Sequence, residues 1–231
     1  MSQSEFWIEL ERRTAKYDLL CHPFYKAWKA GELSREDLRE YARDYYHHVA
    51  AFPGYLGAFA ARLPEGELRA AVLENRDDEL GMGAAAGRAH HAIWLEFARA
   101  MGGDVTEIAE STPLAEVREL IETFERIARE GSSAQALAAF YAYESQVPRV
   151  AADKASGLRE RYGADEAACE YFTLHTTADV HHSRVWREQL DRVITENPEQ
   201  SAAALDAAEN TAQALWRALD GIEARRQAVV S

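Results

Sequence analysis

The chain has 231 residues, of which 47% are hydrophobic and 28% charged, and its formal net charge is −13. This acidity argues against nucleic acid and anionic membrane surfaces as partners, because both require clustered lysine and arginine. No apolar run approaches the roughly 20 residues of a membrane span. The first residues show no basic region followed by an apolar one, so we expect no signal peptide. The two cysteines, Cys21 and Cys169, lack CxxC spacing, so we expect a reducing cytoplasm and no disulfide framework.

Helical patterns follow one another through the first half of the chain. Residues 3–19 form a weak amphipathic helix, and Ser34 and Asp37 have the form of a capping box that opens the next long one. Pro53 should kink or interrupt that helix. Residues 68–79 are again predicted to be helical, after which three glycines loosen the chain until helix resumes around His90.

The second half of the chain continues in the same way. Thr112 and Pro113 are predicted to cap a helix that ends near Gly131. Residues 132–162 are predicted as one long helix with a kink near residues 144–148, and residues 165–195 as another, before a last helix capped by Asn197 and Pro198.

No stretch alternates with a period of two, and no Gly/Ser/Pro-rich linker divides the chain. The pattern therefore predicts an all-α, single-domain bundle of seven or eight helices over residues 1–231, with its core at about residues 3–226.

The stretch from Tyr171 to His182 carries the most informative motif. His175, Asp179 and His182 are spaced i, i+4 and i+7, so on a continuous helix they return to one face at about 100° per residue. Two imidazoles and one carboxylate are a ligand set that suits Fe(II) and similar metals. Because such a triplet also arises as a polar stripe on a solvated helix, a second set of ligands is needed.

Two glutamates are candidates for that second set. Glu144 lies in an apolar and aromatic segment, where a buried carboxylate must be paired, protonated or ligated. On a continuous helix His90 would lie within about 20° of the side of Glu79, whereas His91 would be rotated roughly 120° away. We therefore choose His90 over His91 and predict a site for two divalent ions. Its ligands are Glu79, His90, Glu144, His175, Asp179 and His182.

The other histidines are expected outside this site. His91 and His181 are predicted to be exposed neighbours of the ligands. His47 and His48 are predicted to lie at the edge of the core or on the surface.

Several separated segments resemble the heme-oxygenase-like diiron oxidases. They are HPFYKAWKAGELSREDLREYARDYYHHVAAFPGYL, HAIWLEFARAMG, YAYESQVPRVAADK and YFTLHTTADVHH, in this order between about residues 15 and 190. Within that family the chain looks like the p-aminobenzoate synthases around the chlamydial protein associating with death domains (CADD). The pyrroloquinoline-quinone-synthase-like proteins are similar more loosely and share the seven-helix fold without the metals. The resemblance implies a heme-oxygenase-like bundle and places Glu79, Glu144, His175, Asp179, His182 and, four residues before Trp94, His90 on metal positions.

The resemblance also implies an activity. That group is implicated in a route to p-aminobenzoate for folate that bypasses the usual chorismate enzymes. The resemblance implies that two metal ions, Fe/Fe or Fe/Mn, act with O2 and an external reductant. It also implies that the protein's own tyrosine supplies the ring and its own lysine the nitrogen, in which case each chain would turn over once. The matching residues are Tyr25 in FYKAW, Tyr41 in REYARDYY and Lys154. Without the resemblance, the two tyrosines would be interpreted as core aromatics and Lys154 as a surface lysine.

Other functions stay open on the sequence alone. An oxidase of a free small molecule would use the same ligands and leave Tyr25 and Lys154 intact. A helical protein-interaction module would need no metal, and a heme with His22 as axial ligand would not require the carboxylates. A thiaminase-like enzyme would need a nucleophilic cysteine with supporting neighbours, which neither Cys21 nor Cys169 has. A homodimer is compatible with the sequence.

Overall fold

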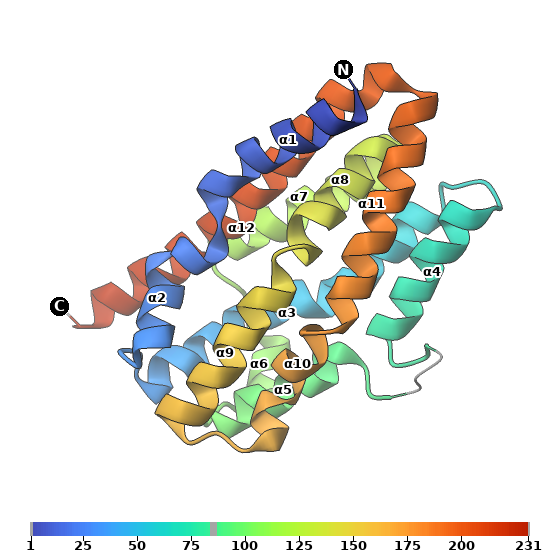
Figure 1. Cartoon of the computed structure of the whole chain (residues 1–231). Coiled ribbons are helices and arrows are strands. Elements are labelled where there is room, and N and C mark those ends of the chain that lie inside the picture. Colours follow the sequence, from blue (N-terminus) through green and yellow to red (C-terminus); the bar gives the residue numbers. More distant parts are fainter. Residues whose placement is uncertain (1, 84–86, 231) are drawn as a thin grey trace.

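Every regular element of residues 2–83 and 87–230, the part of the chain that this computed structural model describes, is a helix. The predicted all-α fold is confirmed, and interruptions within the long predicted helices raise the number of helical segments (Figure 1). In chain order the elements are α1 (Gln3–Thr14), η1 (Ala15–Tyr17), η2 (Leu19–Cys21), α2 (Pro23–Ala30), α3 (Arg35–Ala60), α4 (Glu67–Glu79), α5 (His90–Ala100), α6 (Val105–Glu110), α7 (Ala115–Glu130), α8 (Ser133–Glu144), α9 (Val147–Tyr162), α10 (Glu166–His175), α11 (Ala178–Glu196), η3 (Pro198–Gln200) and α12 (Ser201–Val230).

Local capping explains where α3 begins. The Ser34 hydroxyl accepts a hydrogen bond from the backbone N–H of Asp37 at 3.0 Å, and the Asp37 carboxylate accepts one from the N–H of Ser34 at 2.7 Å. This is the predicted capping box, and it satisfies two N–H groups that the first turn leaves without partners. The helix then runs through Pro53 without interruption.

The predicted start of α7 at Thr112 is wrong. The helix begins at Ala115, and Leu114 occupies the cap position without a capping side chain. The carbonyl of Pro113 accepts a hydrogen bond from the Arg118 side chain at 3.2 Å instead of joining the helix.

The kink predicted near residues 144–148 is instead a break between two helices, with a consequence for the centre of the molecule. α8 ends at Glu144 and α9 begins at Val147, so the long helix expected over residues 132–162 is two helices. Pro148 lacks an N–H and is therefore compatible with the first turn of α9. Glu144 thus stands at a helix end and is 1% exposed.

The helix predicted over residues 165–195 is also divided, which the sequence pattern did not indicate. α10 ends at His175, and Thr177 has φ −120° and ψ −41°, outside the regular helix. The hydroxyls of Thr176 and Thr177 donate hydrogen bonds to the carbonyls of Thr173 and Leu174, at 2.7 and 3.2 Å. Such local side-chain hydrogen bonds compete with the backbone hydrogen bonds of the helix. α11 therefore begins at Ala178 as a separate helix.

The helices enclose an aromatic core, with small residues where helices approach closely. α12 packs along α7, α8 and α1, while α3 contacts α4, α5 and α7 (Figure 1). α8 and α12 bury many alanines, which allow their backbones to come close. No helix among the described residues has the length and apolar character that crossing a membrane requires.

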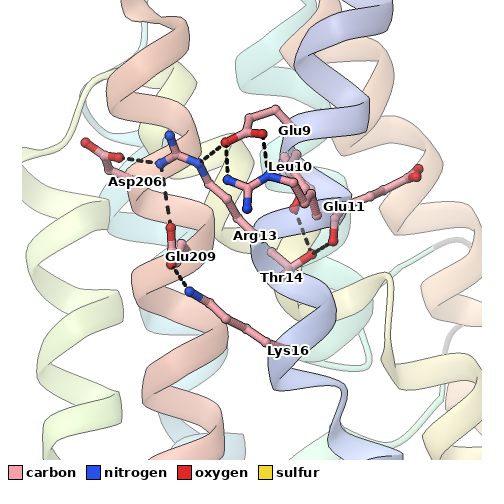
Figure 2. A network of polar contacts seen from close by, with 9 residues as sticks. Glu9, Leu10, Glu11, Arg13, Thr14, Lys16, Asp206 and Glu209 are labelled. Atoms are coloured by element: carbon pink, nitrogen blue, oxygen red, sulfur yellow. Dashed lines mark hydrogen bonds and ion pairs between the residues drawn. The ribbon is translucent and has the colours of Figure 1, made fainter.

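An ion-pair network fastens α1 to the C-terminal helix. Figure 2 shows Arg13 reaching from α1 to Glu9 on its own helix and to Asp206 on α12, at 2.8 and 2.7 Å. Lys16 pairs with Glu209 one turn further along α12. Because these pairs are partly solvated, the buried face of α1 contributes more to its docking than they do. That face consists of Phe6, Trp7 and Leu10.

Candidate metal centre

The six predicted ligands come from five helices whose ends meet in the interior. They form two groups, and in each group one donor atom per residue lies within 4.8 Å of the others. We call these groups triad A and triad B. Triad A consists of Glu79, His90 and His175, and triad B of Glu144, Asp179 and His182, all of them buried.

In triad A the carboxylate oxygens and imidazole nitrogens face one another. The Glu79 Oε2 and His90 Nδ1 atoms are 2.9 Å apart, yet His90 Nδ1 has no hydrogen-bond partner. His175 Nδ1 donates to the backbone carbonyl of Tyr171 at 2.7 Å. That bond fixes the proton on Nδ1 and leaves the Nε2 lone pair directed at Glu79, 3.9 Å from its Oε1.

Triad B has the same character. His182 Nε2 donates to the Asp78 carboxylate at 3.2 Å, while His182 Nδ1 lies 3.4 Å from Asp179 Oδ1 without a hydrogen bond. The Glu144 carboxylate accepts hydrogen bonds from Trp186 Nε1–H and, at 3.2 Å, from the Asn75 amide. These bonds hold the carboxylate in a fixed orientation at the end of α8.

Buried carboxylates and imidazoles that converge in this way normally share protons or a cation, because each polar atom would otherwise lack a partner. The Nδ1 atoms of His90 and His182 face Glu79 and Asp179 without a well-formed hydrogen bond. Three carboxylates and three imidazoles are a donor set that iron and manganese accept. The residues present therefore fit two divalent ions, one in each triad.

The protonation of the triads without metal follows from burial and mutual attraction. Burial raises the pKa of Glu144 to about 8, although His182 opposes the shift. Burial alone would lower the pKa of His182, but Asp179, Glu144 and Asp78 outweigh it and raise that pKa to about 10. Burial would raise the pKa of Glu79, yet His90 and His175 hold it below its usual value. Binding of divalent ions here must therefore release protons.

Two of the geometric arguments from the sequence are wrong, although the residues meet. His175 belongs to triad A while Asp179 and His182 belong to triad B, because the break at Thr176 and Thr177 separates them. Glu79 and His90 do not share a helical face either. They stand at the end of α4 and at the start of α5, which are two separate helices.

The remaining histidines lie outside the triads. His181 is exposed as predicted, and His91 is half-buried. His48 was expected at the core edge, but it is fully buried among aromatic rings, which lower its pKa to about 3 by excluding water. Both ring nitrogens of His22 are engaged, one by the N–H of Phe24 and the other by Asp220.

Three residues that support the triads were not anticipated. Asn75, Asp78 and Trp186 hold Glu144 or His182 in place. Asn75 stands in the acidic run before Glu79, a composition typical of a solvated helix face, yet it is 2% exposed. Its position four residues before Glu79, hence on the same helical face, was the available signal.

A second buried cluster consists of Tyr25, Tyr41 and Lys154, the three residues that the resemblance assigns to the reaction. We call it the tyrosine–lysine cluster. Lys154 Nζ lies 2.7 Å from the Tyr25 hydroxyl and 2.6 Å from the Tyr41 hydroxyl, and the two hydroxyls are 3.2 Å apart. Lys154 is 7% exposed, so its interpretation as a surface residue is wrong. Its Nζ is 4.1 Å from the Tyr25 ring centre and 5.5 Å from those of Trp28 and Phe172.

Burial favours the neutral form of every group in this cluster. It lowers the pKa of Lys154 well below its usual value, and the described residues offer Lys154 no carboxylate partner. Burial raises the pKa of Tyr25 and of Tyr41 well above the usual value of a phenol. The lowered pKa of Lys154 favours an unprotonated amine between two phenols, and an unprotonated amine is a nucleophile.

Gly157 on α9 allows Trp28 to close this cluster. A Cβ atom at residue 157 would lie 2.9 Å from Trp28 Cδ1. Gly157→Ala is therefore expected to lower the free energy of unfolding by about 1–3 kcal/mol, measured by urea denaturation. Gly54→Ala is the matched control, because a Cβ there meets nothing within 4 Å and alanine favours a helix by up to about 1 kcal/mol. Equal stabilities of the two variants would contradict this role of Gly157.

Aromatic rings connect the cluster to triad A. The Tyr171 ring stacks on His175 with centres 4.1 Å apart and contacts Trp94 at 4.8 Å. Trp94 contacts Tyr41 at 5.6 Å, and Tyr41 contacts Tyr25 at 6.3 Å. Oxidisable side chains thus form an unbroken series of contacts from a triad residue to Tyr25.

Several cavities adjoin the triads. A small cavity of about 10 Å³, room for one water-sized molecule, is lined by residues of both triads and by Tyr143 and Tyr171. A far larger one, of about 960 Å³, opens beside His90 and His182 and is lined mainly by residues between α4 and α5, by α10 and by the start of α11. The triads are therefore reachable from outside while the tyrosine–lysine cluster is closed.

Comparisons with known proteins agree with this arrangement. The model of the family described as "Iron-containing redox enzyme" matches residues 39–216. The chain is 35% identical to a 4-aminobenzoate synthase of Chlamydia pneumoniae over 92% of this chain and 93% of that one. It is 36% identical to a 4-aminobenzoate synthase of Nitrosomonas europaea over 96% and 92% of the two chains.

Solved structures establish the fold. A domain of unknown function with a heme oxygenase-like fold from Shewanella denitrificans superposes with a TM-score of 0.83 at 18% identity, over 100% of this chain and 96% of that one. A TenA homologue from Pseudomonas syringae gives a TM-score of 0.82 at 17% identity, over 96% and 95% of the two chains. The extent of the family match and the similarity to these relatives lead to one conclusion: the chain belongs to the heme-oxygenase-like family of iron-containing redox enzymes and is an oxidoreductase.

Proposed function

We propose that this oxidoreductase makes 4-aminobenzoate from two of its own side chains, with Tyr25 as the source of the ring and Lys154 as the donor of nitrogen. The observation that carries the proposal is the contact of Lys154 Nζ with the Tyr25 hydroxyl at 2.7 Å. In 4-aminobenzoate the amino group occupies the ring position that bears the hydroxyl in tyrosine. The only amine in the described surroundings of Tyr25 thus lies beside the carbon that would be aminated. The relatives named 4-aminobenzoate synthase support the same product.

The protein contributes position and protonation state. The lowered pKa of Lys154 makes its nitrogen available as a nucleophile without a separate base. Tyr41 contacts both Lys154 and Tyr25 and can hold a proton between them. Surrounding aromatic rings exclude water, which would compete with the amine for an oxidised ring.

The triads would hold the metal ions, Fe/Fe or Fe/Mn. When bound, two such ions would supply the reduction of O2 with electrons from an external reductant. O2 and the reductant are therefore co-substrates. The ring contacts from His175 through Tyr171, Trp94 and Tyr41 offer a route by which oxidation reaches Tyr25 without O2 entering the closed cluster.

A single-turnover experiment tests the proposal. The chain is produced with 15N-lysine, loaded with iron with and without manganese, and exposed to O2 and an excess of reductant. We expect at most one 4-aminobenzoate per chain, carrying 15N. Unlabelled product, or several products per chain, would show that ring and nitrogen come from elsewhere.

The cavity of about 960 Å³ beside His90 and His182 favours a second candidate function, the oxidation of a free small molecule. In that case Tyr25 and Lys154 would remain intact, and a Lys154 variant would keep its activity. The labelling experiment separates the two functions, because only the self-sacrificing reaction transfers lysine nitrogen.

A further inference from the structure

The helix that carries Tyr25 is short and depends on its surroundings. α2 has eight residues, and an isolated helix of that length is not stable in water. Packing places the Tyr25 hydroxyl against Lys154 of α9 and Tyr41 of α3. α2 also contacts α12, whose C-terminal end lies beside it (Figure 1). Contacts that fix α2 against α12 therefore also fix Tyr25 relative to Lys154.

His22 joins the first turn of α2 to α12. Its Nδ1 atom accepts a hydrogen bond from the backbone N–H of Phe24 at 3.1 Å, which caps the helix. Because Nδ1 accepts, the proton of the neutral ring is on Nε2, which lies 3.1 Å from the carboxylate of Asp220. The His22 ring is fully buried and contacts Trp216, with ring centres 4.7 Å apart. Asp220 thus favours the tautomer in which His22 can cap α2.

A second contact joins α3 to the same end of α12. Asp44 stands three residues after Tyr41 and is buried. Its carboxylate forms an ion pair with Arg225 of α12, and the Nε atom of Arg43 lies 3.7 Å from its Oδ1. Because a buried carboxylate without a partner is costly, Arg225 helps to determine how α3 and α12 meet.

Apolar packing alone does not fix this junction of three helices. A cavity of about 180 Å³ lies among residues of α2, α3 and α12, including Phe24 and Ile222. The Phe24 ring also contacts the rings of Tyr41 and Tyr25, with centres 5.3 and 6.1 Å apart. A shift of α2 or α3 into this space would therefore move the two tyrosines relative to Lys154.

We propose that Asp220 and Arg225, at the end of α12, are positioning residues for the reaction of Tyr25 with Lys154. Each acts through its buried partner, one on α2 and the other on α3. The inference rests on the proposed function and deepens it, because it names more distant groups that hold the reacting side chains in contact. The triads stand on other helices. Substitutions at the end of α12 should therefore lower the yield of 4-aminobenzoate per O2 consumed and leave the consumption of O2 unchanged.

The ratio of 4-aminobenzoate formed to O2 consumed tests this role, because a general loss of structure would lower both quantities. In the metal-loaded chain with reductant, Asp220→Ala is expected to lower the ratio at least about 10-fold, since a displacement of about 1 Å can cost on the order of 100-fold. Asp220→Asn keeps an oxygen that accepts from His22 and is expected to retain most of the yield. Asp206→Asn is the control, because Asp206 stands on the same helix and pairs with Arg13 of α1.

The second contact is tested in the same way. Arg225→Met removes the partner of Asp44 and is expected to lower the ratio, whereas Arg225→Lys keeps the charge and should restore part of it. Arg226→Met is the matched control, because Arg226 pairs with Glu223 on its own helix at 2.7 Å. Ratios in Asp220→Ala and Arg225→Met equal to those of their controls would overturn the inference.

Hydrogen exchange of the metal-free chain separates this inference from the proposed function. Peptides that cover α2 are expected to exchange faster in Asp220→Ala than in Asp206→Asn, while peptides that cover α4 and α11 exchange at unchanged rates. Unchanged exchange of α2 in Asp220→Ala would overturn the inference. An unaltered chain that consumes O2 without forming 4-aminobenzoate would contradict the proposed function, and the exchange of α2 would then decide whether Asp220 holds that helix.

Discussion

Lys154→Met is expected to abolish 4-aminobenzoate formation while the chain still binds two metal ions. The substitution removes the amine that contacts the Tyr25 hydroxyl and keeps an unbranched side chain of similar length in the aromatic surroundings. Product is measured by chromatography after a single exposure to O2, and metal content by elemental analysis. Lys29→Met is the matched control, because Lys29 is exposed and pairs only with Asp153. Product formation by Lys154→Met at the level of the control would exclude Lys154 as the nitrogen donor.

The same variant has a characteristic effect on stability. The pKa of Lys154 lies far below its value of 10.5 in an unfolded chain, so between those two values the unfolded state binds one more proton. The free energy of unfolding of the unaltered chain should therefore rise with pH in that window by about 1.4 kcal/mol per unit relative to Lys154→Met. Below the pKa of the folded state the two slopes converge. Parallel curves throughout would mean that Lys154 is protonated in the folded protein.

The second large effect is expected for Glu144→Gln, which should stabilise the metal-free chain and weaken its metal binding. The pKa of Glu144 rises from 4.5 to about 8 on folding, so its ionisation opposes folding as pH rises through that window. At pH 7 this effect lowers the free energy of unfolding by about 3 kcal/mol, and the neutral amide of glutamine removes that loss. Glutamine keeps an oxygen to accept the hydrogen bond from Trp186 Nε1–H.

Urea denaturation of metal-free protein at pH 5 and pH 7 measures this effect. The advantage of Glu144→Gln should be large at pH 7 and fall below about 1 kcal/mol at pH 5, where Glu144 is protonated in the folded state and partly ionised in the unfolded state, whose pKa is 4.5. In the presence of Fe²⁺ without O2 the order should reverse, because only the unaltered chain gains stability from ions bound in both triads. Destabilisation of the variant at pH 7 without metal would contradict the raised pKa of Glu144 in the folded chain.

The sequence contained enough information for the fold class and for the residues that meet at its centre. Helical periodicity and capping are local properties of the sequence. The capping box at Ser34 and an irregularity near Pro148 could therefore both be predicted. Glu144 was identified because a carboxylate among aromatic residues is chemically conspicuous.

The geometry of the site could not be predicted from the sequence in the same way. The break at Thr176 and Thr177 depends on two hydroxyl bonds that no periodicity reveals, and it assigns His175 and His182 to different triads. Asp78 stood in an acidic run that resembles a solvated face, and its role depends on how α4 meets α11. The burial of Lys154 likewise depends on the packing of α2, α3 and α9, which only the tertiary structure supplies.

The most direct test of self-sacrifice is peptide mass spectrometry of the chain after reaction with iron, manganese, O2 and reductant. The peptides that contain Tyr25 and Lys154 are compared with those of a sample kept without O2. We predict that the Tyr25 peptide loses its aromatic side chain and that the Lys154 peptide loses its amine, in proportion to the 4-aminobenzoate released. Intact Tyr25 and Lys154 peptides in a sample that has formed 4-aminobenzoate would contradict the account.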